Sequence, residues 1–486
     1  MEDLPELCSS ILKEVLVETR GKDVPFVPDV VTDSRKLSAG CIFVAVPGSR
    51  FDGHNFIIEA EKTASVVVHS RPLASYGQNI TYYLVSDASA AAALLFREKY
   101  GRPDTALNLF GVTGTNGKTT TAFILEHLLE NCGLLSTVAF SDGKEVTPAT
   151  HTTPDPETLF CMLKRMKDNH LSATAMELSS HALHQNRARG ARFRAAIFTN
   201  LTGDHLDYHH DMESYYQAKK SFFTQLLSPE GVAVINTDDP AGRRLAQELK
   251  NICRVVTFGT SDADWLIKKL HTTRSGMTFE LVSEENIYPV ETNLAGTYNA
   301  FNLTGAILAV LDSGISFDKI AGKLRQKITV PGRLQFLDAP TGAAFAVDFA
   351  HTDDALTNVL STLRPLTEHK LFCVFGAGGN RDKTKRPRMG KAAAEHADYL
   401  IVTSDNPRTE VPEDIIRDIV AGIPPESSFE VQSDRKAAIR RAFELAGPGD
   451  IVLIAGKGHE NYQEINGIKY PFSDTEVITA CFKGEI

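Results

Sequence analysis

Short runs of hydrophobic residues recur along the chain, and turn-forming or polar residues separate them. The first runs that are rich in β-branched or aromatic residues are Cys41–Val46, Val66–Val68 and Thr81–Val85. Apolar runs of this length between turn residues are typical of strands. We therefore expect a compact, strand-rich first domain that ends near residue 106.

The pattern changes after the polar stretch at 101–104. The apolar run Leu107–Val112 predicts a strand, and the periodic segment Thr120–Leu129 predicts a helix that ends near Gly133. Further strands that alternate with helical segments are expected at Ala173–Met176, Ala195–Thr199 and Val232–Ile235. This alternation indicates a mostly parallel sheet, in a second domain over residues 107–329.

A new alternation of strands and helices follows Val330–Gly332, which we interpret as a hinge. Its strands are expected at Ala344–Val347, Leu371–Phe375, Tyr399–Val402 and Ile451–Ile454. At about 150 residues per domain, a chain of 486 residues also predicts three domains. The predicted fold class is α/β, with domains at 1–106, 107–329 and 330–486, of which the last is Rossmann-like.

Composition and charge exclude several classes of protein. Hydrophobic residues make up 42% and charged residues 23%, which is ordinary globular usage and disfavours disorder or a membrane bundle. The net charge of −10 gives no basic surface for nucleic acid. The longest strongly apolar run, Ala88–Phe96, is too short to cross a bilayer, and the acidic start at residues 1–3 lacks a signal peptide's basic region. We expect a cytoplasmic protein without a membrane partner.

The seven cysteines are scattered along the chain, and no two form a CxxC pair. An odd number without such pairs favours neither a disulfide framework nor a zinc site. We expect buried free thiols.

The segment Gly111–Thr120, with the sequence GVTGTNGKTT, joins the predicted strand and helix of the second domain. Small residues let backbone N–H groups approach phosphate oxygens, Lys118 can reach the β- and γ-oxygens, and a threonine hydroxyl can bind Mg²⁺. The spacing departs from the strict P-loop pattern, because Val112 stands where its first glycine would be. We nevertheless predict a central P-loop domain that binds ATP.

Polar residues follow two later strands of the same domain. Glu177 comes directly after a predicted strand end and could complete a magnesium site, although such a residue can equally be a helix cap or a solvated charge. Asp204 and His205 follow the next strand and could hold a second cation or a phosphate, or could belong to an ordinary polar turn.

The helix expected at about 212–227 carries two adjacent lysines. Lys219 lies on an apolar stripe, but Tyr216 and Phe223 give the opposite face an apolar option, so periodicity alone does not choose between Lys219 and Lys220. A buried lysine must be paired or modified, whereas a lysine that reaches the surface needs neither.

Nine ordered motifs between about Asp33 and Gln463 together resemble the Mur ligases of bacterial cell-wall synthesis. They are GVTGTNGKTTT, MELSSHAL, FTNLTGDHLDYH, GTYNAFN, VPGRLQ, VDFAHT, GAGGNRDKTKRPRMG, SDNPRTE and AGKGHENYQ. The departures are Phe349 for a usual Tyr, Asp353 for a usual Pro and Asn380 for a frequent Asp. Within the family the chain resembles the tripeptide-forming branch.

The resemblance implies that ATP is a co-substrate and that two Mg²⁺ ions assist. The implied ATP-binding residues are Thr113, Gly114, Thr115, Asn116, Gly117, Lys118, Thr119, Thr120, Asn299, Asn302 and His351. The implied metal ligands are Thr119, Thr120, Glu177, His205 and Lys219, the last as a carbamate (N6-carboxylysine). Lys118, Glu177, His205 and Lys219 would be the catalytic residues.

The same resemblance implies two further substrates. UDP-N-acetylmuramoyl-L-alanyl-D-glutamate would bind an N-terminal UDP-sugar-binding domain and the residues Ser34, Thr152, Thr153, Ser179, Gln185 and Arg187. meso-Diaminopimelate would bind a C-terminal amino-acid-binding domain through Arg381, Asp405, Asn406, Pro407, Arg408, Gly456 and Glu460. Activation of the substrate's carboxylate as an acyl phosphate would precede attack by the amine, and we expect a monomer in the bacterial cytoplasm.

Residue chemistry agrees with diaminopimelate as the amino acid. Diaminopimelate differs from lysine by a second carboxylate, which the planar guanidinium of Arg408 can bind with two parallel hydrogen bonds. Glu460 supplies an anion for the distal ammonium. A lysine-adding Mur ligase, a folate polyglutamate ligase and, from a different class, a P-loop ATPase scaffold are the alternatives.

Overall fold

The computed structural model describes residues 4–22, 24, 29–48 and 51–486. Residues 1–3, on which the expectation about a signal peptide rests, lie outside this part. The chain divides into two compact units, one formed by 1–258 with 305–315 and the other by 259–304 with 316–486. The predicted three-domain boundaries therefore stay a prediction, although each predicted range contains its own strands.

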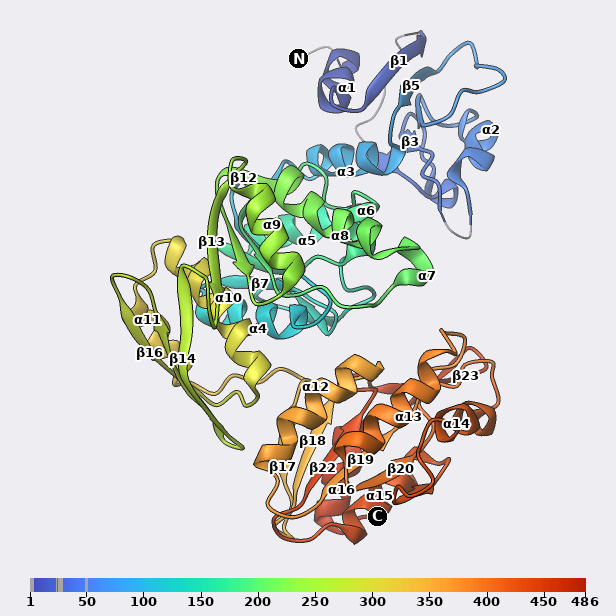
Figure 1. Cartoon of the computed structure of the whole chain (residues 1–486). Coiled ribbons are helices and arrows are strands. Elements are labelled where there is room, and N and C mark those ends of the chain that lie inside the picture. Colours follow the sequence, from blue (N-terminus) through green and yellow to red (C-terminus); the bar gives the residue numbers. More distant parts are fainter. Residues whose placement is uncertain (1–3, 23, 25–28, 49–50) are drawn as a thin grey trace. The chain divides into compact units, whose positions relative to one another are not determined.

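The N-terminal part of the first unit is a small sheet with its own helices (Figure 1). Its strands have the order β1 (Leu16–Gly21), β5 (Thr81–Val85), β4 (Val66–His69), β3 (Ile42–Val44) and β2 (Val30–Val31). Only β1 among these described strands runs antiparallel to its neighbour. The accompanying helices are α1 (Leu4–Leu12), α2 (Ile57–Ala60) and α3 (Ala88–Lys99), with 3₁₀ turns at Ser34–Lys36, Gly53–Phe56 and Pro103–Thr105.

The rest of this unit is built around a second sheet, which is mainly parallel. Neighbouring strands follow the order β13 (Arg254–Gly259), β12 (Leu227–Asn236), β11 (Phe193–Phe198), β6 (Asn108–Thr113), β10 (Ala173–Glu177), β7 (Cys132–Leu135), β8 (Ala139–Ser141) and β9 (Val146–Pro148). From β13 to β7 the neighbours are parallel, as the alternating pattern predicted.

Helices connect the parallel strands of this second sheet. They are α4 (Lys118–Leu128), α5 (Pro156–Asp168), α6 (Ser180–His184), α7 (Leu206–His209), α8 (Met212–Ser221), which continues as a π turn at Phe222–Leu226, α9 (Pro240–Leu249) and the C-terminal part of α10 (Thr297–Asp312). The prediction that Gly133 ends a helix was wrong, because Gly133 lies in β7. A Cβ there would come 2.6 Å from Met166 Sδ, so glycine is needed for close packing against α5.

The second unit begins with an antiparallel meander, where the sequence had predicted a continued parallel sheet. Its strands are β14 (Trp265–Thr273), β15 (Gly276–Val282) and β16 (Ile287–Thr292). The two residues between β14 and β15 are too few for the crossover that parallel strands require. Helix α11 (Phe317–Leu324) follows, and its contacts are with β16.

The rest of this unit is a six-stranded sheet, all within the described residues, with helices on both faces (Figure 1). The strand order is β17 (Gln335–Asp338), β18 (Ala344–Asp348), β22 (Ile451–Ala455), β19 (Leu371–Phe375), β20 (Tyr399–Val402) and β21 (Phe429–Val431). One apolar cluster joins the sheet to α12 (Asp353–Leu363), α13 (Lys385–His396) and α14 (Pro412–Val420), and another joins it to α15 (Arg435–Leu445) and α16 (Asp474–Lys483). The predicted strands are confirmed, and β23 (Tyr462–Ile465) and β24 (Ile468–Pro471) add a hairpin.

The predicted hinge at Val330–Gly332 is packed rather than exposed. Val330 is buried, and a Cβ on Gly332 would come 2.1 Å from the backbone nitrogen of His459. This segment therefore packs against the loop that follows β22.

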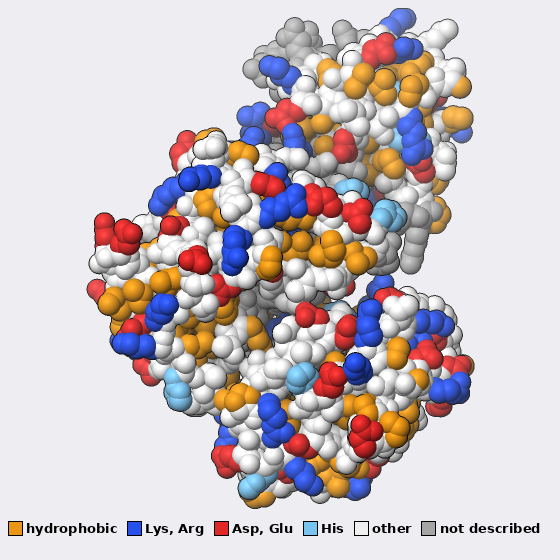
Figure 2. Space-filling model, viewed as in Figure 1, with side chains coloured by type: hydrophobic (Ala, Val, Ile, Leu, Met, Phe, Trp, Pro, Cys, Tyr) orange, Lys and Arg blue, Asp and Glu red, His pale blue; other side chains and the backbone are white. Residues whose placement is uncertain are grey.

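The charges on the surface and the state of the cysteine thiols agree with what the composition predicted. Figure 2 shows acidic and basic side chains interspersed over the face that it presents. Over the described residues, no helix is long and apolar enough to cross a membrane. The cysteines in this part are free thiols, and Cys8, Cys41, Cys373 and Cys481 are buried.

Candidate functional site

At two positions in the loop between β6 and α4, the backbone has a conformation that only glycine adopts easily. Gly114 has φ +154°, and a Cβ there would come 1.9 Å from Thr199 Oγ1. Gly117 precedes the first turn of α4 with φ +87°. The loop is held from the neighbouring strand end, since Asn116 donates its backbone N–H to Asn200 Oδ1 over 2.9 Å. Thr113 to Thr120 thus form a braced turn at a helix N-terminus, as a phosphate-binding loop requires.

Two lysine amines meet at this loop. Lys118 Nζ donates to the carbonyls of Gly114 and Thr115 over 2.9 and 2.8 Å. Lys219 Nζ, on α8, donates to the Gly114 carbonyl over 2.7 Å and is 1% exposed. Lys220 instead forms an ion pair with Glu248 over 2.9 Å. The structure therefore decides the choice that periodicity left open, because Lys219 is the inward lysine.

Burial gives Lys219 unusual acid–base behaviour. The pKa of its amine lies well below the ordinary value, because burial disfavours the charged form and Lys118 adds repulsion, while Asp204 opposes the shift. The amine also lies 4.5 Å from the centre of the Tyr215 ring. A depressed pKa favours the neutral amine, which is the form that can react with an electrophile such as CO₂.

Glu177 is neither a cap nor a solvated charge. It is 1% exposed at the end of β10. Its carboxylate accepts hydrogen bonds from Thr119 Oγ1 (3.1 Å), the Thr137 backbone N–H (2.7 Å) and Thr137 Oγ1 (3.1 Å). The structure thus brings the P-loop threonine and the strand-end carboxylate together, as a magnesium site needs. In the described part of the chain no three His, Cys, Asp or Glu side chains form a metal-holding group.

His205 lies at the edge of a cluster of aromatic rings. It is exposed, has φ +55°, and its Nε2 lies 3.5 Å from an Asp204 carboxylate oxygen. Its ring centre is 4.9 Å from that of His181. His209 is buried in the same cluster, where burial and the neighbouring histidines lower its pKa to about 4.

Five of the six residues assigned to the UDP-linked substrate lie close together. Thr153 Oγ1 accepts from the Ser179 N–H over 2.9 Å, and Arg187 donates to the Thr153 carbonyl over 2.8 Å and to Gln185 Oε1 over 2.8 Å. Thr152 accepts from Thr137 Oγ1 over 3.1 Å, Thr137 also donates to the Glu177 carboxylate, and the Glu177 carbonyl accepts from Thr153 Oγ1 over 2.8 Å. Ser34 lies apart in the sequence, in the 3₁₀ turn at Ser34–Lys36.

The remaining residues assigned to ATP belong to the second unit. Asn299 and Asn302 are buried one turn apart on α10, and Asn302 donates to Asn299 Oδ1 over 2.9 Å. His351 is exposed just after β18, and its Nδ1 lies 2.8 Å from the Phe349 carbonyl.

The residues assigned to the amino acid surround a buried amide at the end of β20. Asn406 donates from Nδ2 to Glu460 Oε2 over 2.8 Å and accepts at Oδ1 from Lys457 Nζ over 3.0 Å. Lys457 is fully buried and also donates to Glu460 Oε2 over 3.1 Å. Glu460 is therefore held in place by two donors before any ligand binds.

Of the remaining predicted residues, Gly456, Pro407 and Arg408 adjoin this cluster. Gly456 has φ +113°, and a Cβ there would come 2.5 Å from an Asp405 carboxylate oxygen. Arg408 has φ +53° and donates from Nη1 to the Gly379 carbonyl over 2.7 Å. Pro407 lies next to it, whereas Arg381 is exposed.

Sequence reasoning missed three residues that hold these groups. Lys457 stands between two glycines directly after a buried strand, and that position could have identified it. Thr137 and Glu464, which contact Glu177 and Arg408, carry no such signal.

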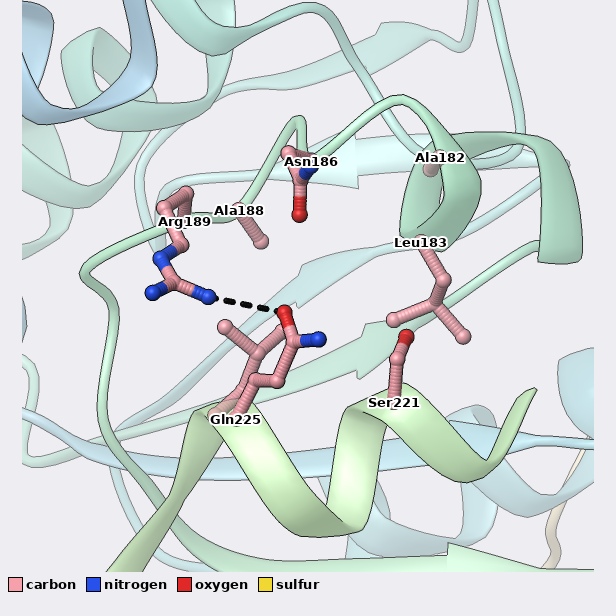
Figure 3. Close-up of a pocket in the computed structure, with 8 residues that line it drawn as sticks. Ala182, Leu183, Asn186, Ala188, Arg189, Ser221 and Gln225 are labelled. Atoms are coloured by element: carbon pink, nitrogen blue, oxygen red, sulfur yellow. Dashed lines mark hydrogen bonds between the residues drawn. The ribbon is translucent and has the colours of Figure 1, made fainter. Parts of the chain in front are cut away.

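A small pocket elsewhere in the first unit contains none of the predicted residues (Figure 3). It is lined by Ala182, Leu183, Asn186, Ala188, Arg189, Ser221, Gln225 and Leu226. Arg189 crosses it and donates to Gln225 Oε1 over 2.8 Å. Because Arg189 also pairs with Glu14, its charge is already compensated, and the pocket carries no chemistry.

Comparison with known proteins gives consistent matches over both units. The family descriptions "Mur ligase middle domain" and "Mur ligase, glutamate ligase domain" match residues 112–310 and 332–458. A UDP-N-acetylmuramoyl-L-alanyl-D-glutamate–2,6-diaminopimelate ligase of Aquifex aeolicus is 42% identical over 94% of each chain. A solved structure of a ligase with this same name has a TM-score of 0.68 at 33% identity and covers 95% of both chains. A MurF ligase of Thermotoga maritima in complex with ADP shares the fold, with a TM-score of 0.60 at 21% identity over 94% of this chain and 97% of its own.

Proposed function

Because this chain belongs to the Mur ligase family, we propose that it is an ATP-dependent, ADP-forming ligase that adds meso-diaminopimelate to UDP-N-acetylmuramoyl-L-alanyl-D-glutamate in peptidoglycan precursor synthesis. The observation that carries the proposal is the 42% identity, over 94% of each chain, to a ligase named for these two substrates. The partly buried network around Asn406, Glu460 and Arg408 supports it, since these groups can receive a zwitterionic amino acid.

In the first step, the γ-carboxylate of the D-glutamate attacks the γ-phosphate of ATP, which gives an acyl phosphate and ADP. The loop at Thr113–Thr120 would hold the phosphates through its N–H groups, and Lys118 would exchange its loop carbonyls for phosphate oxygens. The chain then acts by positioning and by neutralising charge, and no protein nucleophile is required.

In the second step, an amine of diaminopimelate attacks the acyl carbon, and phosphate leaves. Glu460 would accept the distal ammonium, and Arg408 would bind the distal carboxylate, so that the reacting amine at the other end is directed to the acyl phosphate. Lysine lacks the distal carboxylate, which gives the pocket a basis for rejecting it.

The donor set near the loop fits Mg²⁺. Thr119, Glu177, His205 and a carbamate on Lys219 would be ligands, with Thr120 beside them, and oxygen donors predominate as Mg²⁺ prefers. When bound, the two ions would neutralise charge on the phosphate that is transferred.

A carbamate on Lys219 is supported by the burial and the depressed pKa of its amine. Reaction of the neutral amine with CO₂ forms an N–C bond and releases one proton, which converts the side chain into an anion. An anion beside Lys118 replaces a repulsive pair with an attractive one.

Ligation can be tested by measuring ADP release with a panel of amino acids. We expect turnover that needs ATP, the UDP-linked dipeptide and diaminopimelate together. Turnover with lysine or with a folate and glutamate instead would favour the related ligases, and ATP hydrolysis without the dipeptide would favour an ATPase scaffold.

The variant Lys118→Ala tests the assignment of the ATP site. It should stay folded but lose at least about 3 kcal/mol of transition-state stabilisation, because it removes one charge from the phosphates. ADP release at near wild-type rate in this variant would contradict the assignment.

A further inference from the structure

Strand β23 and the turn of the hairpin β23–β24 are hydrogen-bonded to the Asp405–Arg408 loop. Gln463 Nε2 donates to the Asp405 carbonyl over 2.7 Å, and the Glu464 N–H donates to Asn406 Oδ1 over 2.9 Å. Arg408 then donates its backbone N–H to the Glu464 carbonyl over 3.0 Å and accepts from the Asn466 N–H over 2.7 Å. The hairpin thus pairs with this loop through backbone hydrogen bonds, as a neighbouring strand would.

These bonds hold Arg408 in a strained backbone conformation. Its φ of +53° is left-handed, which a residue with a Cβ adopts only when the surroundings impose it. Two backbone hydrogen bonds from the hairpin supply that constraint. The direction in which the Arg408 side chain leaves the backbone therefore depends on β23–β24.

Glu464 also fixes the guanidinium itself. Its Oε2 lies 3.3 Å from Arg408 Nε, while Nη1 donates to the Gly379 carbonyl over 2.7 Å. Neither contact uses Nη2. The side chains of Arg408 and Glu464 are only 23% and 25% exposed, so this pair is partly shielded from solvent.

We propose that Glu464 is a positioning residue that sets the amino-acid selectivity of this ligase, because it orients Arg408 toward the distal carboxylate of the substrate. The proposal rests on the proposed function, in which Arg408 binds that carboxylate. With Nε paired to Glu464 and one Nη1 proton donated to the Gly379 carbonyl, the second Nη1 proton and Nη2 are left to donate in parallel to the two oxygens of the substrate carboxylate. Glu464 does not contact the reacting amine and acts only through Arg408.

Removing Glu464 should therefore raise KM for diaminopimelate and leave kcat nearly unchanged. An ion pair that is partly shielded from solvent contributes more than an exposed pair and less than a fully buried one, which is enough for a change of about 10- to 100-fold, so Glu464→Ala should raise KM by roughly that factor. Lysine has no distal carboxylate, so its kcat/KM should change less than about 2-fold. Glu464→Gln keeps the shape and an acceptor oxygen and should recover part of the loss.

The experiment measures kcat and KM for diaminopimelate and for lysine in the full-length enzyme, with ATP and the UDP-linked dipeptide saturating. Glu413→Ala is the matched control, because Glu413 is an exposed glutamate of the same unit outside this cluster. The thermal midpoint of each variant is measured in parallel, and direct binding of diaminopimelate gives a second readout.

The outcomes separate this inference from the proposed function. Loss of selectivity in Glu464→Ala, partial rescue in Glu464→Gln and an unchanged control support the inference. If wild-type enzyme ligates diaminopimelate but Glu464→Ala keeps its KM, or loses activity equally toward both amino acids, the inference is overturned alone. If wild type does not use diaminopimelate, the proposed function fails first.

Discussion

Lys219 illustrates how position changes the chemistry of a side chain. Its neighbour Lys220 has a carboxylate partner, while Lys219 is enclosed and faces Lys118 and a carbonyl. A cationic amine in that position is unfavourable, and conversion to a carbamate removes the difficulty.

We predict that Lys219→Ala is inactive and is partly rescued by short carboxylic acids such as formate or acetate. These acids restore an anion without the side chain, whereas Lys219→Arg should give no activity, because it supplies only a cation. Initial rates over a range of acid concentrations test this. A crystal structure of the active, ligand-bound enzyme with a bare Lys219 ammonium in an ion pair would rule out the carbamate.

Arg408→Ala should weaken the use of diaminopimelate selectively. Loss of a partly shielded charged pair should lower kcat/KM for diaminopimelate by about 10- to 10³-fold, since such contacts contribute about 1.5–4 kcal/mol. Lysine should lose little, and Arg408→Lys should recover only part of the loss because an ammonium lacks the planar fork.

The measurement is kcat/KM for both amino acids with the other substrates saturating. Equal proportional losses would mean that Arg408 maintains the loop rather than contacts the substrate.

At the scale of single residues, the sequence predicted the charged residues of the site better than the residues that hold them in place through hydrogen bonds or ion pairs. The turn at Gly111–Thr120 could be predicted because its glycines restrict the backbone, whereas the strand-end position of Glu177 left a magnesium ligand, a cap and a solvated charge open. Thr137 and Glu464 could not, because one hydroxyl or carboxylate in a loop becomes meaningful only when folding brings its partner near.

Among the elements, the turn between β6 and α4 is the most tightly specified. Gly114→Ala should disrupt it, because a Cβ would overlap Thr199 Oγ1 and the φ of +154° would be strained. We expect a loss of ATP affinity of at least 10-fold with the global fold retained.

Equilibrium binding of ATP and circular dichroism test this prediction together. Gly322→Ala serves as the control, since a Cβ on that exposed glycine of α11 meets nothing within 4 Å. Unchanged ATP affinity in Gly114→Ala would show that the loop can rearrange.

Strands were predicted well where both faces are buried, as for Leu371–Phe375 and Tyr399–Val402, which match β19 and β20. The meander β14–β16 was missed because its residues alternate between exposed and buried, which gives no continuous apolar run. The start of α4 at Lys118 rather than Thr120 follows from Gly117, whose left-handed backbone begins the helix directly.

At the scale of the whole molecule, the assigned residues are divided between the two units. Those for phosphate and the UDP-linked substrate belong to the first unit, and those for the amino acid, with Asn299, Asn302 and His351, belong to the second. Amide formation requires that the acyl carbon and the amine come into bonding distance, so we expect ligand binding to be coupled to domain closure.

We predict that the radius of gyration falls when ATP, Mg²⁺, the UDP-linked dipeptide and diaminopimelate are present. Small-angle scattering of a monomeric sample with and without ligands measures this change, and Lys118→Ala should show a smaller one. Identical scattering curves for wild type in both conditions would contradict closure.

The buried cysteines give each unit its own reporter of local opening. Cys8 and Cys41 lie in the first unit and Cys373 and Cys481 in the second, and burial raises the pKa of Cys8 to about 12. An alkylating reagent attacks the thiolate, so these sulfurs should be modified only when their surroundings open. Mass spectrometry of peptides after timed alkylation in denaturant would then follow the opening of each unit in the unaltered chain, without an engineered probe.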